Sequence, residues 1–261
     1  RERGERPLAG VRVLDLTRVL AGPACGRELA AHGADVLLVS SPRLPSIEPF
    51  VMDTSHGKRS AFVDLETQDG AVQLRELAAG ADVFIEGYRT GSLARRGFGP
   101  EQLAAMRPGI VYVSINCYGH HGPWRERPGW EQLAQTVTGT AAIEGGDGPP
   151  RLLPAAACDY TTGYLAAYGA MTALARQTRE GGSWHVRASL CQTAMWIDRT
   201  GVVHEPAAAR GLGETADLMT ASDTPWGRLV HLKPAASMSA TAPRWVSPSV
   251  PLGTHQAAWS A

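Results

Sequence analysis

The sequence lacks long hydrophobic runs, an excess of either charge and any clustering of its four cysteines. Its apolar runs are far shorter than the roughly 20 residues that span a bilayer, so we expect no membrane partner. The 25 basic and 25 acidic residues balance, and no basic stripe interleaves with aromatic residues, which disfavours nucleic-acid binding. Cys25, Cys117, Cys158 and Cys191 form no Cys-x-x-Cys pair, which indicates reduced thiols and predicts a cytoplasmic protein.

Motifs of several familiar enzyme classes are also missing. There is no P-loop, no Gly-x-Ser-x-Gly elbow and no His-Glu-x-x-His pattern. The segment GFGPEQ (97–102) begins like a dinucleotide fingerprint, but it lacks the third glycine of that motif. The eight histidines show no metal-ligand spacing, and the adjacent side chains of His120 and His121 are expected to point apart. We therefore expect neither a nicotinamide enzyme nor a metal site.

What the sequence does contain is an alternation of apolar strands and helical segments. Runs such as IVYVSIN (110–116) are apolar almost throughout, as are strands buried on both faces of a parallel sheet. The pattern predicts an α/β fold with a Rossmann-like open parallel sheet. We expect strands at 11–16, 35–39, 60–65, 82–86 and 110–116, with helices at 24–31, 68–78 and 101–106.

The alternation changes after residue 116. Expected elements there are helices at 130–138, 160–176 and 191–203, a strand at 185–190 and a hairpin strand at 228–233. The remaining sequence beyond residue 206 is irregular. We therefore expect a large domain over residues 1–200, and a reduced second domain with a C-terminal return segment over residues 201–261.

One acid stands at the start of the otherwise apolar segment CDYTTGYLAAYGA (158–170). Asp159 is either the N-cap of a core helix, since Asp is a preferred cap residue, or a carboxylate held for chemistry. At an N-cap, the helix dipole and the amides of residues 160–162 would keep it ionised at neutral pH.

Several segments together resemble the class III (CaiB/BaiF) CoA-transferase family. In family order, they are PLAGVRVLDLTRVLAGPACGRELAAHGADV, HGKRSAFVDLE, ADVFIEGYRTGSLARRGFGPEQLAAMRPGIVYVSINCYGHHGPW, RPGWEQLAQTVTG and CDYTTGYLAAYGAMTALARQTREGGSWHVRASL. The resemblance implies a Rossmann-like CoA-binding domain, a smaller second domain, an acyl-CoA substrate, and a homodimer whose two chains are interlocked.

By position, the resemblance makes Asp159 the nucleophile. A carboxylate can attack a thioester carbonyl and expel the CoA thiolate, leaving an aspartyl-acyl anhydride from which a carboxylic acid acceptor completes the transfer. Trp130 stands where the family's racemases carry a histidine, and indole cannot shuttle protons near neutral pH. We expect Glu131 to orient Asp159 or bind substrate; the alternative is a solvated residue in the first turn of a helix.

The resemblance also implies cations for the CoA phosphates. Arg89 and Arg95 follow an expected strand, at the end where α/β sheets collect ligands. Guanidinium pairs with phosphate in bidentate geometry, although a role as plain surface arginines is the alternative. Lys58 and Arg59, in HGKRS, match another stretch near the family's CoA cleft.

Three departures from the family pattern stand out. The interval 196–221 is too short for a stable domain carrying the family's glycine-rich loop. Leu20 replaces a glutamine of the oxalate-type transferases, and a charged residue is missing before Pro42, a loss that Arg43 would offset. With a first residue other than Met, these features suggest one half of a fused protein, or a chain that pairs with a second family-related half.

Three functions remain open from the residues and the resemblance. The first is an acyl-CoA:carboxylate CoA-transferase that uses Asp159. The second is an acyl-CoA isomerase, racemase or lyase, which Trp130 disfavours. The third is a non-catalytic family member that binds CoA, which the short interval 196–221 favours.

Overall fold

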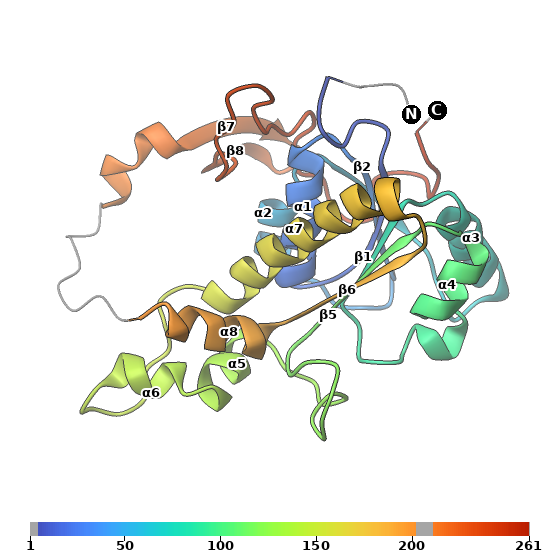
Figure 1. Cartoon of the computed structure of the whole chain (residues 1–261). Helices are drawn as coiled ribbons and strands as arrows, with labels where there is room; N and C mark the ends of the chain where they lie inside the picture. The colour runs from blue at the N-terminus through green and yellow to red at the C-terminus, as the bar shows by residue number, and fades with distance from the viewer. Residues whose placement is uncertain (1–4, 202–210, 261) are drawn as a thin grey trace.

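The computed structural model describes residues 5–201 and 211–260. Its main sheet has six parallel strands in the order β3-β2-β1-β4-β5-β6 (Figure 1). This is the strand order of a doubly wound Rossmann fold, in which the order reverses between β1 and β4. The strands are β1 (Arg12–Leu16), β2 (Asp35–Ser40), β3 (Lys58–Phe62), β4 (Val83–Glu86), β5 (Val111–Asn116) and β6 (Trp184–Ser189). The predicted α/β parallel sheet is confirmed.

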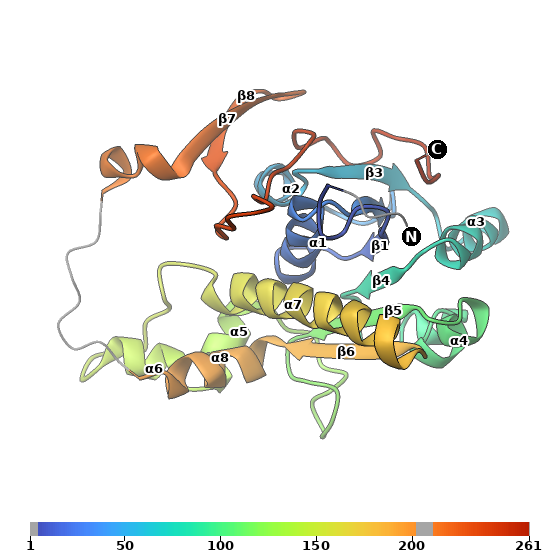
Figure 2. The ribbon, with the colours of Figure 1, turned by 45° about the horizontal axis from the view of Figure 1, so that its top comes forward.

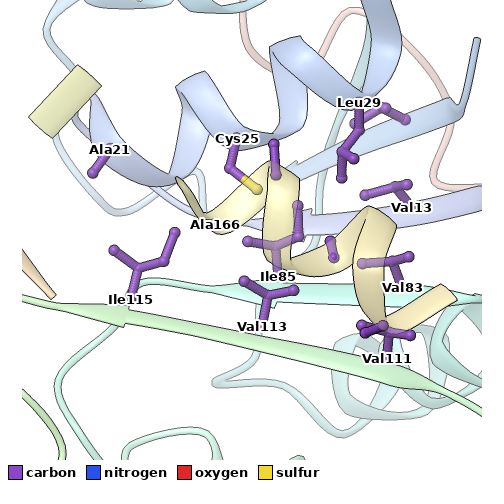
Figure 3. Packing of buried hydrophobic residues seen from close by; sticks show 14 of the residues in the cluster. Val13, Ala21, Cys25, Leu29, Val83, Ile85, Val111, Val113, Ile115 and Ala166 are labelled. Atoms are coloured by element: carbon purple, nitrogen blue, oxygen red, sulfur yellow. The ribbon is translucent and has the colours of Figure 1, made fainter. Parts of the chain in front are cut away.

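Helices cover both faces of the sheet, because successive residues of a strand point to opposite sides. Val13, Ile85 and Val113 pack with α1 and α7 on one face, as Figure 3 shows. Leu14 and Phe84 belong to the second core, with residues of α3 and α4. The helices are α1 (Ala21–Ala31), α2 (Glu48–Thr54), α3 (Gln68–Ala79), α4 (Pro100–Met106), α5 (Glu131–Val137), α6 (Thr140–Gly145), α7 (Ala157–Glu180) and α8 (Leu190–Arg199).

The contact between α1 and α7 determines where the first turn of α7 lies. A Cβ atom on Gly163 would lie 2.6 Å from the Ala21 carbonyl oxygen, so the two helices meet at a position that only glycine fits. Near its other end, Thr178 of α7 lines a cavity with Val11 and Arg107, beside the amino ends of the strands. Helix α7 therefore runs antiparallel to the strands (Figure 2), and its first turn lies at the carboxyl edge of the sheet.

Most expected elements are present with shifted ends. Strand β3 begins at Lys58 rather than residue 60, and α7 begins at Ala157 rather than residue 160. Two short helices, α2 and α6, were not expected, because one or two turns are too short to show an apolar period. Within residues 5–201 and 211–260, no helix has both the length and the hydropathy to cross a membrane.

The C-terminal part is a hairpin followed by a segment that returns across the main sheet. Strands β7 (Met219–Thr224) and β8 (Gly227–Leu232) pair antiparallel, as the predicted hairpin strand requires. The return segment is anchored by Trp245 Nε1, which donates to the Arg27 carbonyl, and by Trp259 Nε1, which donates to the Leu77 carbonyl. The domain division near residue 200 stays a prediction; residues 202–210, which include the end of the helix expected at 191–203, lie outside the described residues.

Candidate active site

Asp159 and Glu131 are brought together at the carboxyl edge of the sheet. Asp159 is the third residue of α7 and Glu131 is the first residue of α5, and both are only 5% exposed. Glu131 Oε2 accepts the backbone N–H of Asp159 at 2.6 Å, and Glu131 Oε1 accepts that of Cys158 at 3.1 Å. The Gln135 amide also donates to Glu131 Oε1, at 2.6 Å. Both oxygens of Glu131 are therefore engaged in holding the start of α7.

This geometry corrects the predicted role of Asp159 as an N-cap. The N-cap residue is Ala156, whose side chain makes no capping bond, and Tyr160 N–H donates to the Ala156 carbonyl within the helix. A carboxylate from another helix, Glu131, satisfies the first amides instead. The alternative of a solvated Glu131 is also wrong, because the side chain is buried.

The expectation that Asp159 is held ionised by helix amides is wrong as well. Burial, and then the neighbouring charge of Glu131, raise the pKa of Asp159 to about 7. Desolvation and a like charge both favour the protonated acid. Near neutral pH the carboxyl group therefore exchanges readily between its two forms, and the ionised form is a stronger base than an ordinary aspartate.

A largely apolar cavity of about 360 Å³ has Trp130 in its lining, whereas neither Asp159 nor Glu131 lines it. Trp130, the neighbour of Glu131, is 60% exposed and lines the cavity with Val19, Leu44 and Phe50. Val19 has a φ of 70°, a conformation that β-branched residues rarely adopt and that surrounding structure must enforce. Leu20, where the family's oxalate-type members have glutamine, is buried and begins α1 without a side-chain cap.

Arg89 and Arg95 lie at the same edge of the sheet, in the segment that follows β4. Both side chains are exposed, and no hydrogen bond or ion pair of either guanidinium occurs within the described residues. A Cβ atom on Gly91 would lie 3.1 Å from Arg95 Nη1, so this guanidinium packs over a glycine turn. Their role in binding the CoA phosphates stays a prediction.

Lys58 and Arg59 lie elsewhere. Lys58 is buried, and its Nζ donates to Asp15 Oδ2 at 2.8 Å and to the Pro23 carbonyl at 2.7 Å, so it joins β1, β3 and α1 within the core. Arg59 pairs with Asp35 at 3.2 Å, at the amino end of β2. The cationic groups of Lys58 and Arg59 are engaged by these partners, and we leave both residues out of the proposed CoA site.

Arg43 lies at the carboxyl edge, as its suggested role near CoA requires. Its side chain is 66% exposed, and its Nε donates to Asp64 at 2.7 Å. It lines a cavity of about 300 Å³ together with Tyr88 and Arg96.

Sequence reasoning missed several groups near this edge. Burial raises the pKa of Glu86, the last residue of β4, to about 7, and its Oε2 accepts the Tyr88 N–H. Its place before Arg89, at a strand's carboxyl end, was the available signal. Tyr160, next to Asp159, donates its hydroxyl to Asp53 at 2.7 Å, and Asp53 pairs with Arg27 at 2.8 Å. No sequence spacing points to this chain of contacts.

The four cysteines are free and buried, and the cytoplasmic location that they suggested stays a prediction. Within the described ranges, no three His, Cys, Asp or Glu side chains gather as a metal-ligand set. His120 and His185 instead both hydrogen-bond Ser114 Oγ, each at 2.8 Å.

Known proteins resemble this chain in both sequence and structure. The model of CoA-transferase family III matches residues 8–225. An acyl-CoA transferase of Gibberella moniliformis is 37% identical over 243 residues, which are 88% of this chain and 42% of the relative. Succinyl-CoA:glutarate CoA-transferase of Mus musculus is 37% identical over 199 residues, 71% of this chain and 45% of the relative.

Among solved structures, a CaiB/BaiF family protein from Brucella suis superposes with a TM-score of 0.69 at 33% identity, covering 74% of this chain and 55% of that protein. The chain thus spans about half the length of the curated relatives it matches. Because the family model covers most of the chain, and the α/β sheet matches that of a family member, the protein belongs to CoA-transferase family III.

Proposed function

We propose that the chain provides the nucleophilic half-site of an acyl-CoA:carboxylate CoA-transferase. The observation that carries the proposal is Asp159: a buried carboxyl group at the carboxyl edge of the sheet, whose pKa of about 7 comes from burial and Glu131. Perturbed carboxyl groups of this kind are typical of catalytic sites. Family membership supports the same chemistry.

The proposed reaction begins with the ionised form of Asp159. One carboxylate oxygen attacks the thioester carbonyl carbon, the C–S bond breaks, and CoA leaves as its thiolate. The thiolate then attacks the Asp159 carbonyl carbon of the resulting anhydride and releases the donor acid, leaving an aspartyl-CoA thioester. The carboxylic acid acceptor takes CoA from this thioester by the same steps in reverse.

Glu131 acts in this scheme as a positioning residue. Its two oxygens hold the Cys158 and Asp159 amides, so it sets the direction of the first turn of α7. Its charge also helps raise the pKa of Asp159. Arg89 and Arg95 are proposed to bind CoA phosphates, because both are exposed cations at the ligand-binding edge of the sheet.

Proton transfer at the α-carbon is less well supported. Trp130, which precedes Glu131, has no group that titrates near neutral pH, and Glu131 is committed to backbone amides. These contacts favour the transferase over an isomerase, a racemase or a lyase.

The test is to trap the intermediate. Protein incubated with succinyl-CoA, the donor named for the mouse relative, is treated with hydroxylamine and digested. A hydroxamate at Asp159 is expected, and it should be absent from Asp159→Asn. CoA binding without any modification at Asp159, in full-length protein with glutarate as acceptor, would leave only the non-catalytic role.

We also propose that the site is completed by a second family chain, either another copy or a related half. The chain spans about half the length of its relatives. Large apolar side chains are exposed on three neighbouring helices: Ile143 of α6 is 56% exposed, Tyr168 of α7 is 67% and Trp196 of α8 is 50%. We likewise propose that residues 201–261 form a reduced second domain. Light scattering, with Trp196→Gln as the variant, should show an assembly that this substitution weakens.

A further inference from the structure

Another cavity lies between the β7–β8 hairpin and residues 233–248, away from the candidate active site. Its volume is about 700 Å³. None of Asp159, Glu131, Arg89 or Arg95 lines it. The hairpin lies on the side of α2, as Figure 2 shows, and Trp226 Nε1 in its turn donates to Glu48 Oε1 at 2.8 Å.

The lining is positively charged. None of the described residues that line the cavity is Asp or Glu. Its hydrogen-bonding and charged groups include His56, Thr220, Ser222, His231, Lys233 and Arg244. A cavity with two permanent cations and no carboxylate attracts anions.

His56 provides the strongest sign of a ligand. It is 1% exposed, and its Nε2 has no hydrogen-bond partner. The ring is stacked with Trp245, at 5.0 Å between centroids, and lies 4.0 Å from the ring of His231. A buried ring nitrogen left without a partner is costly, so a group that could hydrogen-bond it would be stabilised there. Burial, then His231 and Arg27, lower the pKa of His56 to about 4, so the ring is neutral at pH 7.

The neighbouring polar groups are oriented by their own contacts. His231 Nδ1 lies 2.9 Å from the Leu232 carbonyl, which can only accept, so this nitrogen carries the proton. In the neutral ring, His231 Nε2 then accepts the Ser222 hydroxyl at 2.6 Å. Lys233 Nζ donates one hydrogen to the Asp217 carbonyl at 2.9 Å, and an ammonium group has two more.

We propose that this cavity binds a phosphate group of a small molecule. Phosphate offers several acceptor oxygens to the Lys233 ammonium and the Arg244 guanidinium, and one more to the Nε2–H tautomer of His56. The same chemistry fits free pyrophosphate and the phosphates of a nucleotide. This site is independent of the proposed transferase reaction.

Lys233 makes the proposal directly testable. Lys58 and Lys233 are the two lysines of the sequence, and Lys58 is buried while Lys233 is exposed. Acetylation of the full chain by a succinimidyl ester, followed by peptide mass spectrometry, therefore reports on Lys233. Pyrophosphate should slow acetylation of Lys233 by about tenfold at saturation, because a bound phosphate engages the amine. Sodium chloride at matched ionic strength should not.

Two variants locate the site, and a third serves as control. Arg244→Gln and His56→Phe should each raise the pyrophosphate concentration for half-protection about tenfold. Arg179→Gln, an exposed arginine at the end of α7, should not change it. His56→Phe keeps an aromatic ring against Trp245, and Arg244 is exposed, so at least one variant should fold.

Three outcomes would overturn the proposal: no protection by either phosphate compound, equal protection by sodium chloride, or protection that survives both variants. The same acetylation experiment is repeated with adenosine 3′,5′-bisphosphate in place of pyrophosphate. If only this compound protects Lys233, the bound phosphate group belongs to a nucleotide. If pyrophosphate protects as well, a free phosphate is enough for binding. Either result supports the site.

Discussion

Replacing Asp159 with asparagine should stabilise the protein at alkaline pH while abolishing transfer. Asparagine has nearly the same shape, but it cannot ionise. The native structure holds Asp159 beside Glu131 in a buried position, where the charged form is disfavoured. The variant removes that unfavourable charge.

The magnitude follows from the pKa of Asp159, which is about 7 in the folded protein against an ordinary value of 3.8. Between these values the native state binds the proton and the unfolded chain has lost it. Stability therefore falls as the pH rises through this window. The full difference corresponds to about 4 kcal/mol, reached above pH 7 and absent below about pH 4.

The assay is urea unfolding of wild type and Asp159→Asn at about pH 8 and about pH 4.5, with equal m values required. The variant should gain several kcal/mol at the higher pH and little at the lower. Asp147→Asn, at an exposed position, is the control and should change stability by less than about 0.5 kcal/mol at either pH. A variant no more stable than wild type at about pH 8 would refute the placement of a buried, protonatable acid at position 159.

Other expected outcomes concern the same region and the core. Transfer activity should fall as the pH drops below about 7, since attack requires ionised Asp159. Glu131→Gln should move this acidic limb of the pH–activity profile to lower pH, because the variant lacks the charge that raises the pKa of Asp159. An acidic limb that does not move in stopped assays would exclude an effect of the Glu131 charge on that pKa. The same variant should lose about 1–3 kcal/mol in urea unfolding, because an amide NH₂ cannot accept one of the two backbone N–H groups; Glu180→Gln, on the surface, is its control. Gly163→Ala should cost about 1–3 kcal/mol, because its Cβ would lie 2.6 Å from a backbone oxygen; a neutral result in thermal melts would contradict the close contact of α1 and α7. Lys58→Ala should cost about 3–5 kcal/mol of unfolding free energy by leaving Asp15 buried and unpaired. Arg95→Gln, in contrast, should leave stability unchanged and raise the KM for acyl-CoA. Unchanged stability with a raised KM in Lys58→Ala would return Lys58 to the CoA site.

Contacts between residues far apart in the sequence are what sequence reasoning could not predict. Asp159 and Glu131 were both predicted, but their contact runs through backbone amides of α7 rather than between substrate-binding groups. The N-cap prediction failed because a carboxylate 28 residues away occupies the capping position. Lys58 and Arg59 were adjacent in sequence and shared a prediction, yet adjacent residues on a strand face opposite sides. One is therefore buried against Asp15, and the other reaches Asp35.

The sequence by itself determined the parallel α/β sheet, the strand ends where ligands collect, and the acid at position 159. Local apolar periodicity and turn residues are enough for these, because neighbouring residues in the chain decide them. Only the tertiary structure decided the raised pKa of Asp159, the capping role of Glu131, and the unpartnered nitrogen of His56. Each depends on burial and on partners far along the chain, and desolvation depends on what the whole fold places around a group.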